Sequence, residues 1–328
     1  MHQVERLAVG ATQAYTKQLL GSAYEAQNRA EAALAHFREA IELWSASPQY
    51  QNVMLHADQS RLLWQSTGDL KGAKQEALLA RLTAEIYHGA VEEHLGHYAQ
   101  AKTMYDSAIS IADSLEGCLL QKSLAYSYAG GLAWKQGYVI NAIHLLNTSI
   151  NWADKLGDSY RPSYYRVDLS AAYITAGNYS EAIHQAELGL NIALPLHHGW
   201  LIAILSSNAA EAHYYLGNFE QAEALIAQSL NQEEATFIPY ALTVLGMVRR
   251  AQNQYEESIK HLKEAVQFAQ DTQDRYAEAA AWRQLGDTHR AASQPTQAQE
   301  AYDKALAHYN YMKLDKEIGE VTQALALL

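Results

Sequence analysis

The sequences AGNYSEA at residues 176–182 and LGNFEQA at residues 216–222 are two copies of one phrase. In each copy a glycine precedes an asparagine and an aromatic residue, and an alanine follows five residues after the glycine. Extending this register along the chain gives eight turn positions, which are Asn28, Gly68, Gly96, Gly137, Gly177, Gly217, Asn253 and Ser293. Glycine and asparagine adopt the left-handed backbone that ends a helix at low energetic cost. The phrase therefore predicts a helical hairpin that recurs about every forty residues.

Two further positions in each copy hold small residues. The position five residues after the turn is occupied by Ala33, Ala73, Ala101, Ala142, Ala182, Ala222, Ser258 and Ala298. The position seven residues beyond that is occupied by Ala40, Ala80, Ala108, Ser149, Gly189, Ser229, Ala265 and Ala305. Small side chains at this spacing share one helix face and let two helices approach closely. The pattern predicts that these residues lie between the two helices of each hairpin.

The composition also favours an all-α chain. Alanine makes up 56 of the 328 residues, whereas there are only 18 glycines and 5 prolines. Alanine is the best helix former, and proline inside a helix costs about 3 kcal/mol. Three prolines fall at predicted helix starts and the other two between helices; these are Pro48, Pro162 and Pro239, then Pro195 and Pro295. None interrupts a predicted helix.

This pattern resembles the tetratricopeptide repeat, whose signature is visible as Trp282, Leu285-Gly286, Ala298, Tyr302 and Ala305. The resemblance covers about residues 13–311 and implies a right-handed α-α superhelix of about eight helical hairpins, with residues 1–328 forming a single solenoid domain. The repeats start near residues 14, 54, 82, 123, 163, 203, 239 and 279. Apolar residues from Leu314 to Leu325 predict a C-terminal capping helix over residues 314–327. The period of the repeats, about forty residues, is similar to that in the sensor arm of maltose-regulator-type bacterial signalling ATPases.

One repeat departs from this period. Only 28 residues separate Gly68 from Gly96, and Arg81 replaces the usual aliphatic residue. There is room for two helices only if they run together, so we predict a fused or kinked helix between these two glycines.

Charge and motifs exclude several classes of function. A formal charge of −12 and a pI near 5.6 disfavour nucleic acid and an acidic membrane surface as direct partners. The single cysteine, Cys118, cannot form an internal disulfide, and no secretory signal or membrane span is recognisable, so we expect a cytoplasmic protein. The 14 histidines form no His-Glu-x-x-His motif, and there is no phosphate-binding loop or nucleophile elbow. We therefore expect no enzyme activity, no cofactor and no metal.

In tetratricopeptide arrays the first helix of each hairpin lines a concave groove. Transferring the groove positions of the family to this chain gives the predicted binding residues Tyr128, Trp134, Tyr164, Asp168, Asn208, Glu211, Tyr215, Arg250, Arg283 and Arg290. The aromatic members offer contact area and a hydrogen-bonding tip, and the arginines suggest that one end receives a carboxylate or a phosphate. The carboxylate clamp of chaperone-binding arrays is absent, since Val167 and Ala171 stand where that clamp needs Lys and Asn.

The resemblance implies a non-catalytic interaction module in bacterial signalling or regulation, binding a protein segment, a peptide or a small effector in its groove. One alternative is a peptide-pheromone receptor of the Rap or PlcR type, although such receptors carry an N-terminal bundle or DNA-binding domain, for which there is no room before residue 13. Another is a structural scaffold or homo-oligomer that uses its convex surface or its ends. Repeat architecture alone does not choose among these.

Overall fold

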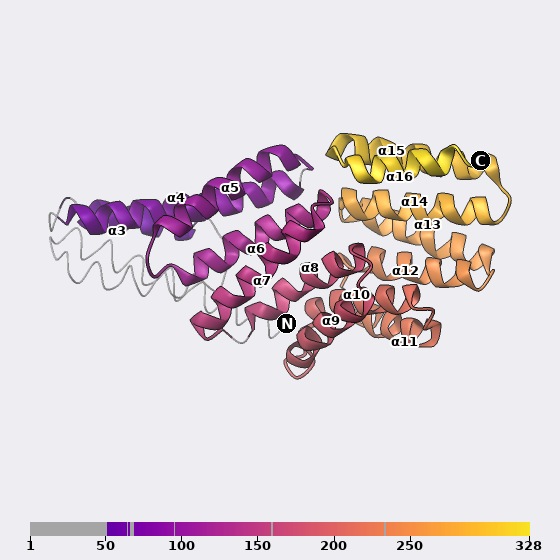
Figure 1. Cartoon of the computed structure of the whole chain (residues 1–328), viewed down its shortest axis with the longest axis horizontal. Helices are drawn as coiled ribbons and strands as arrows, with labels where there is room; N and C mark the ends of the chain where they lie inside the picture. The colour runs from indigo at the N-terminus through magenta and orange to yellow at the C-terminus, as the bar shows by residue number, and fades with distance from the viewer. Residues whose placement is uncertain (1–50, 64, 66–68, 95, 159, 233) are drawn as a thin grey trace. The chain divides into compact units, whose positions relative to one another are not determined.

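The computed structural model describes residues 51–63, 65, 69–94, 96–158, 160–232 and 234–328 (Figure 1). These residues form fourteen α-helices and no β-strand. The helices are α3 (Gln51–Leu62), α4 (Leu70–His94), α5 (Tyr98–Ser114), α6 (Leu119–Lys135), α7 (Val139–Leu156), α8 (Arg161–Thr175), α9 (Tyr179–Ala193), α10 (Gly199–Tyr215), α11 (Phe219–Leu230), α12 (Ile238–Ala251), α13 (Tyr255–Asp271), α14 (Arg275–Ala291), α15 (Pro295–Met312) and α16 (Asp315–Leu325).

The chain divides into two compact units. The first comprises residues 1–92 and 99–125, and the second comprises residues 93–98 and 126–328. The prediction of one continuous solenoid over residues 1–328 stays a prediction. Within the described ranges, no helix is both long and apolar enough to span a bilayer.

In the first unit, α4 confirms the fused helix predicted between two closely spaced turns. It runs without a break for 25 residues, where a regular repeat would have two helices and a turn. Helix α5 packs closely on it, because a Cβ atom added at Gly89 would lie only 2.5 Å from a ring carbon of Tyr105. Helix α3 is joined to α4 by a hydrogen bond of 2.7 Å from the Ser60 hydroxyl to the Ala73 carbonyl.

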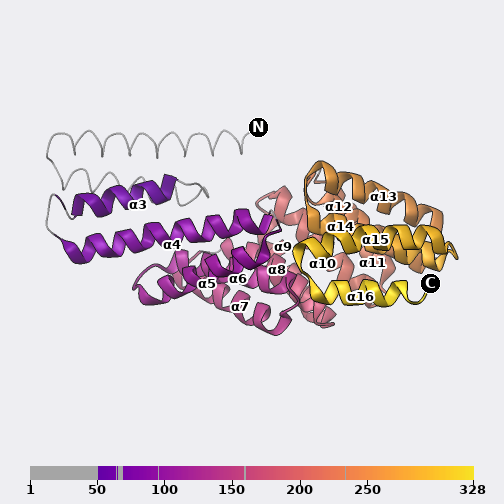
Figure 2. The ribbon, with the colours of Figure 1, turned by 90° about the horizontal axis from the view of Figure 1, so that it is seen from above.

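The second unit is a series of helical hairpins that follow the predicted register. Helices α8, α10, α12 and α14 each pack on the helix that follows in the chain. They also pack on each other in sequence, α8 on α10, α10 on α12 and α12 on α14. Figures 1 and 2 show α14, α15 and α16 side by side at the C-terminal end of this series. The predicted all-α solenoid of hairpins is confirmed for these described helices.

The predicted turn residues have the backbone that the sequence pattern indicated. Left-handed φ angles occur at Gly96, Gly137, Gly177, Gly217, Asn253 and Ser293. The amide of Asn178 then donates to the carbonyl of Tyr173 at 2.9 Å, which closes the end of α8. The other two predicted turn residues, Asn28 and Gly68, lie outside the described residues.

The small residues lie between helices, as predicted. Ala142, Ala182, Ala222 and Ala298 are completely buried. Ser258 replaces alanine at this position without loss, because its hydroxyl donates to the Gly246 carbonyl at 2.7 Å.

Pro162, Pro239 and the final helix also follow the sequence pattern. Pro162 and Pro239 lie in the first turn of α8 and α12, as predicted, where a missing amide hydrogen costs nothing. Pro295, which was predicted to lie between two helices, is instead the first residue of α15. Helix α16 occupies the predicted capping segment, and it buries Val321 against the preceding hairpin.

The two ends of the second unit meet. The hydroxyl of Tyr98 lies 3.5 Å from the Met312 sulfur, a contact between residues 214 positions apart. The ring of Trp134 on α6 lies 5.7 Å from that of Tyr276 on α14, measured between centroids. The beginning of this unit is therefore in direct contact with its C-terminal helices α14 and α15.

Candidate functional site

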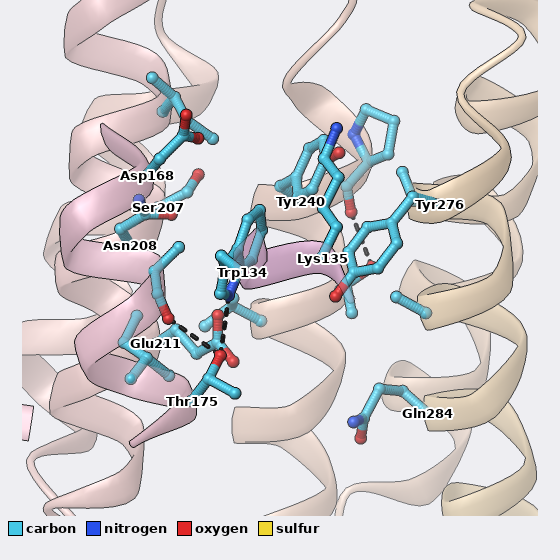
Figure 3. Close-up of a pocket in the computed structure, with 18 of the residues that line it drawn as sticks. Trp134, Lys135, Asp168, Thr175, Ser207, Asn208, Glu211, Tyr240, Tyr276 and Gln284 are labelled. Atoms are coloured by element: carbon cyan, nitrogen blue, oxygen red, sulfur yellow. Dashed lines mark hydrogen bonds between the residues drawn. The ribbon is translucent and has the colours of Figure 1, made fainter. Parts of the chain in front are cut away.

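A cavity of about 750 Å³ lies inside the second unit. Most of the side chains that line it come from α6, α8, α10, α12, α14, α15 and α16, and Tyr179 at the start of α9 adds another. Figure 3 shows Asp168, Ser207 and Glu211 along one wall and Tyr276 and Gln284 across from them. Forty-residue spacing brings these residues together, because equivalent positions of successive hairpins face the same side of a solenoid.

Six of the ten predicted binding residues line this cavity. They are Trp134, Asp168, Asn208, Glu211, Tyr215 and Arg283. The other four, Tyr128, Tyr164, Arg250 and Arg290, lie outside the set of residues that form its wall.

Tyr164, Arg250 and Arg290 interact with other side chains, and the partner of Arg250 is itself a lining residue. The hydroxyl of Tyr164 lies 2.7 Å from that of Tyr160 and 3.1 Å from His198 Nε2, within an aromatic cluster. Arg250 donates to the Gln284 side chain at 2.9 Å. Arg290 lies 3.6 Å from the Asp287 carboxylate.

The wall formed by α8 and α10 carries two partly buried carboxyl groups. Burial raises the pKa of Asp168 to about 6, although the charge of Lys135 opposes the shift. Burial likewise raises the pKa of Glu211 to about 7, opposed by Arg283. Near neutral pH, Glu211 is therefore close to half protonated and Asp168 is largely ionised.

The lack of a side chain at Gly131 on α6 leaves room for one of these acids. A Cβ atom at that position would lie 2.6 Å from the Asp168 Oδ2 atom. Any larger residue at position 131 would displace the carboxylate.

The cations of the cavity are already paired. Lys135 donates to Glu93 at 2.9 Å, and Arg283 lies 2.7 Å from Glu320. Burial acts to lower the pKa of Lys135, but the neighbouring Glu93 carboxylate outweighs it and the net shift is upward. The expectation that a cationic end receives a carboxylate or a phosphate stays a prediction; Arg283 is paired with Glu320, and Arg250 lies outside the wall.

Neutral polar groups near the two acids are held in fixed orientations. The buried Asn208 amide donates to the Val167 carbonyl at 2.9 Å and to the Ser170 hydroxyl at 2.8 Å. The Trp134 indole donates to the Thr175 hydroxyl at 2.8 Å (Figure 3). These bonds fix the wall on which the carboxyl groups stand.

Sequence reasoning missed several residues of the wall, including Trp200, Tyr276 and Glu317. Trp200 and Tyr276 precede the repeat starts predicted at residues 203 and 279, because α10 and α14 begin four residues earlier than those starts. Glu317 belongs to the capping helix, which was predicted only to cover an apolar face. The described part of the chain has no group of three or more His, Cys, Asp or Glu side chains placed to hold a metal ion.

Comparisons with known proteins agree with this fold. Tetratricopeptide repeat family models match residues 14–43 and 237–310. Comparison with curated protein sequences returned no match.

Three similar solved structures illustrate the likeness. A Rap protein complexed with Competence and Sporulation Factor is 12% identical, with a TM-score of 0.56, and the match covers 98% of this chain and 97% of that one. The Rap conjugation gene regulator of the plasmid pLS20, in complex with a Phr peptide, is 16% identical, with a TM-score of 0.56 and coverage of 95% and 98%. A signal transduction ATPase with a tetratricopeptide repeat sensor from Pyrococcus horikoshii is 14% identical, with a TM-score of 0.49 and coverage of 91% and 52%.

At these identities the likeness is one of fold. Together with the matched family models and the observed hairpins, it shows that the chain carries tetratricopeptide repeats and has the fold of a tetratricopeptide-repeat solenoid.

Proposed function

We propose that the chain is a non-catalytic interaction module that binds a peptide or a short protein segment in the cavity of its second unit. The observation that carries the proposal is the cavity itself. Its volume of about 750 Å³ falls within the range of roughly 300–1,000 Å³ that is usual for ligand sites.

The lining suits a peptide. Trp200, Tyr240 and Tyr276 offer large rigid faces with polar tips, a combination that binds side chains and backbone at low entropic cost. Two proteins of similar fold are complexed with Competence and Sporulation Factor and with a Phr peptide, which supports a peptide as the occupant here. The proposal includes a role in bacterial signalling or regulation and a cytoplasmic location.

The test is selection of randomised heptapeptides displayed on phage against the full chain, followed by calorimetric titration of the selected sequences. Ala280→Trp places a bulky ring in the cavity from α14. Ala227→Trp makes the same change at an exposed position on α11, away from the cavity.

We expect selected peptides to bind the wild type and Ala227→Trp equally, and Ala280→Trp at least about tenfold more weakly, a difference of about 1.4 kcal/mol. Circular dichroism spectra of the three proteins should coincide. Failure to select any peptide, or equal binding to both tryptophan variants, would refute the proposal.

A further inference from the structure

The charged groups that line the cavity are unbalanced. Five carboxyl groups face three cations, which are Asp168, Glu211, Asp274, Glu317 and Glu320 against Lys135, Arg283 and Lys316. The excess is acidic even before Glu93, which pairs with Lys135, is counted.

Each of the three cations has a carboxylate partner. Lys135 lies 2.9 Å from Glu93, Arg283 lies 2.7 Å from Glu320, and Lys316 lies 3.9 Å from the same glutamate. No lining cation is left to neutralise a further acid at ion-pair distance.

Two acids on neighbouring helices lack such a partner. Among the described residues, neither Asp168 on α8 nor Glu211 on α10 has a hydrogen bond or an ion pair within 4.0 Å. Asp274 differs from them, because it accepts hydrogen bonds from the Tyr240 hydroxyl at 2.8 Å and from the Ala277 amide at 3.0 Å. The described part of the protein therefore supplies hydrogen-bond donors to Asp274, whereas it supplies none to Asp168 or Glu211.

Glu317 on α16 is a third acid of the cavity with an oxygen atom that lacks a hydrogen-bond donor in the protein. Only 8% of this residue is exposed, and its Oε2 atom is buried with no hydrogen-bond partner, although the side chain lines the cavity. A buried acceptor without a donor is destabilising, and a donor supplied by a ligand would offset that effect.

Aromatic side chains complete the surroundings of these acids. The charges of Glu317 and Glu211 both act on Tyr276 and contribute, after burial, to the raised pKa of its hydroxyl. Tyr276 therefore lies within electrostatic range of both acids, across the cavity from Asp168 (Figure 3). A cation in this space meets carboxylates and the electron-rich faces of aromatic rings, both of which attract positive charge.

We propose that the cavity selects a ligand carrying an ammonium or guanidinium group, which binds at the wall of α8 and α10, where the carboxyl groups of Asp168 and Glu211 have no ion-pair partner. The inference rests on the proposed function, and the group is a lysine or arginine side chain of the bound peptide. A cation so placed forms charge-assisted hydrogen bonds with acids that have no donor in the protein. The pKa values of Asp168 and Glu211, which burial raises, agree with this arrangement, since Lys135 and Arg283 oppose the shifts without reversing them.

The first arm of the test uses heptapeptides acetylated at the N-terminus and amidated at the C-terminus, so that side chains carry the only charges. Peptides selected on the full chain are resynthesised with citrulline for arginine or norleucine for lysine. Each pair is titrated at one fixed salt concentration against the wild type and Asp168→Asn/Glu211→Gln. The control variant is Asp303→Asn/Glu300→Gln, which removes the same two charges from exposed positions on α15.

We expect the neutral peptide to bind the wild type and the control variant about 10- to 100-fold more weakly than the cationic peptide. With Asp168→Asn/Glu211→Gln the difference should shrink to less than about threefold. Selected peptides that lack a cation, or an equal loss in all three proteins, would overturn the cation specificity and leave peptide binding intact.

A second arm titrates spermidine, a polyamine with the same ammonium chemistry and no peptide backbone. One outcome is that no peptide is selected but spermidine binds, and this binding requires Asp168 and Glu211. That result would support the cation site and refute a peptide as the source of the cation. Absence of both peptide and spermidine binding would refute the proposed function and the cation site together.

Discussion

Replacing Glu211 by glutamine should stabilise the protein at pH 8 and have less effect at pH 5. In the folded chain the pKa of this glutamate is about 7, against 4.5 for an unperturbed side chain, because burial disfavours the carboxylate. Between these two values the unfolded chain has released the proton and the folded chain retains it. Stability therefore falls as the pH rises through this window and is level above about pH 7.

The difference between the two pKa values corresponds to roughly 3 kcal/mol of destabilisation at pH 8 and about 1 kcal/mol at pH 5. Glutamine has nearly the same shape and no charge, so Glu211→Gln removes this penalty. For a unit of this size 1 kcal/mol shifts Tm by about 2–4 °C. The increase in Tm that Glu211→Gln causes should therefore be roughly 5–10 °C larger at pH 8 than at pH 5.

The assay is thermal denaturation followed by circular dichroism in buffers of equal ionic strength. Glu300→Gln, an exposed change on α15, measures the effect of the altered net charge. A difference in Tm between Glu211→Gln and the wild type that is the same at both pH values would refute the reasoning. A variant less stable than the wild type at pH 8 would refute it as well.

Three further substitutions probe the packing and the polar contacts of the second unit. Gly246→Ala should lower the free energy of unfolding, measured by urea denaturation, by about 1–3 kcal/mol, because the new Cβ atom would lie 2.5 Å from a leucine of α13. In the control Gly319→Ala the new Cβ atom meets nothing within 4 Å, so this variant should not be destabilised. Equal effects of the two substitutions would contradict the close packing at Gly246. Asn208→Ala should cost about 1–3 kcal/mol by the same measurement, since it removes both hydrogen bonds of a buried amide. Lys135→Met should lower Tm, because it removes the ion pair with Glu93. Adding Glu93→Gln to this variant should restore part of the lost Tm. No recovery in the double variant would count against a stabilising ion pair.

Much of the repeat register was predictable because its signals are local. A left-handed turn residue such as Gly177 and a small residue such as Ala182 act within one hairpin, so their spacing reports the hairpin directly. The fused helix α4 was predictable for the same reason, since 28 residues cannot hold two helices and a turn of the usual length.

The site was only partly predictable, because its membership depends on contacts between repeats. The family positions identify the helix face that carries Asp168 and Glu211, and the structure places both in the cavity wall. They do not show which charges are paired. The bond from Arg250 to Gln284 joins residues 34 positions apart, and its partner cannot be read from spacing alone.

Helix starts account for a second kind of omission. The recurring Gly-Asn-aromatic motif predicts the turn inside each hairpin. It does not predict where the first helix of the hairpin begins, because that helix can extend a variable distance before the motif. Helix α10 begins at Gly199, which places Trp200 in the wall although the repeat was predicted to start at residue 203.

The meeting of Tyr98 with Met312 has a consequence for how the second unit folds. An open array of repeats grows by adding neighbours, so its contacts are short-range in sequence and its ends can fray independently. A contact that spans 214 positions requires the whole array to be in place before it forms. Loop-closure entropy makes such a contact slow to form, and loss of the last helices would be felt at the first, so cooperativity in this unit should extend from end to end.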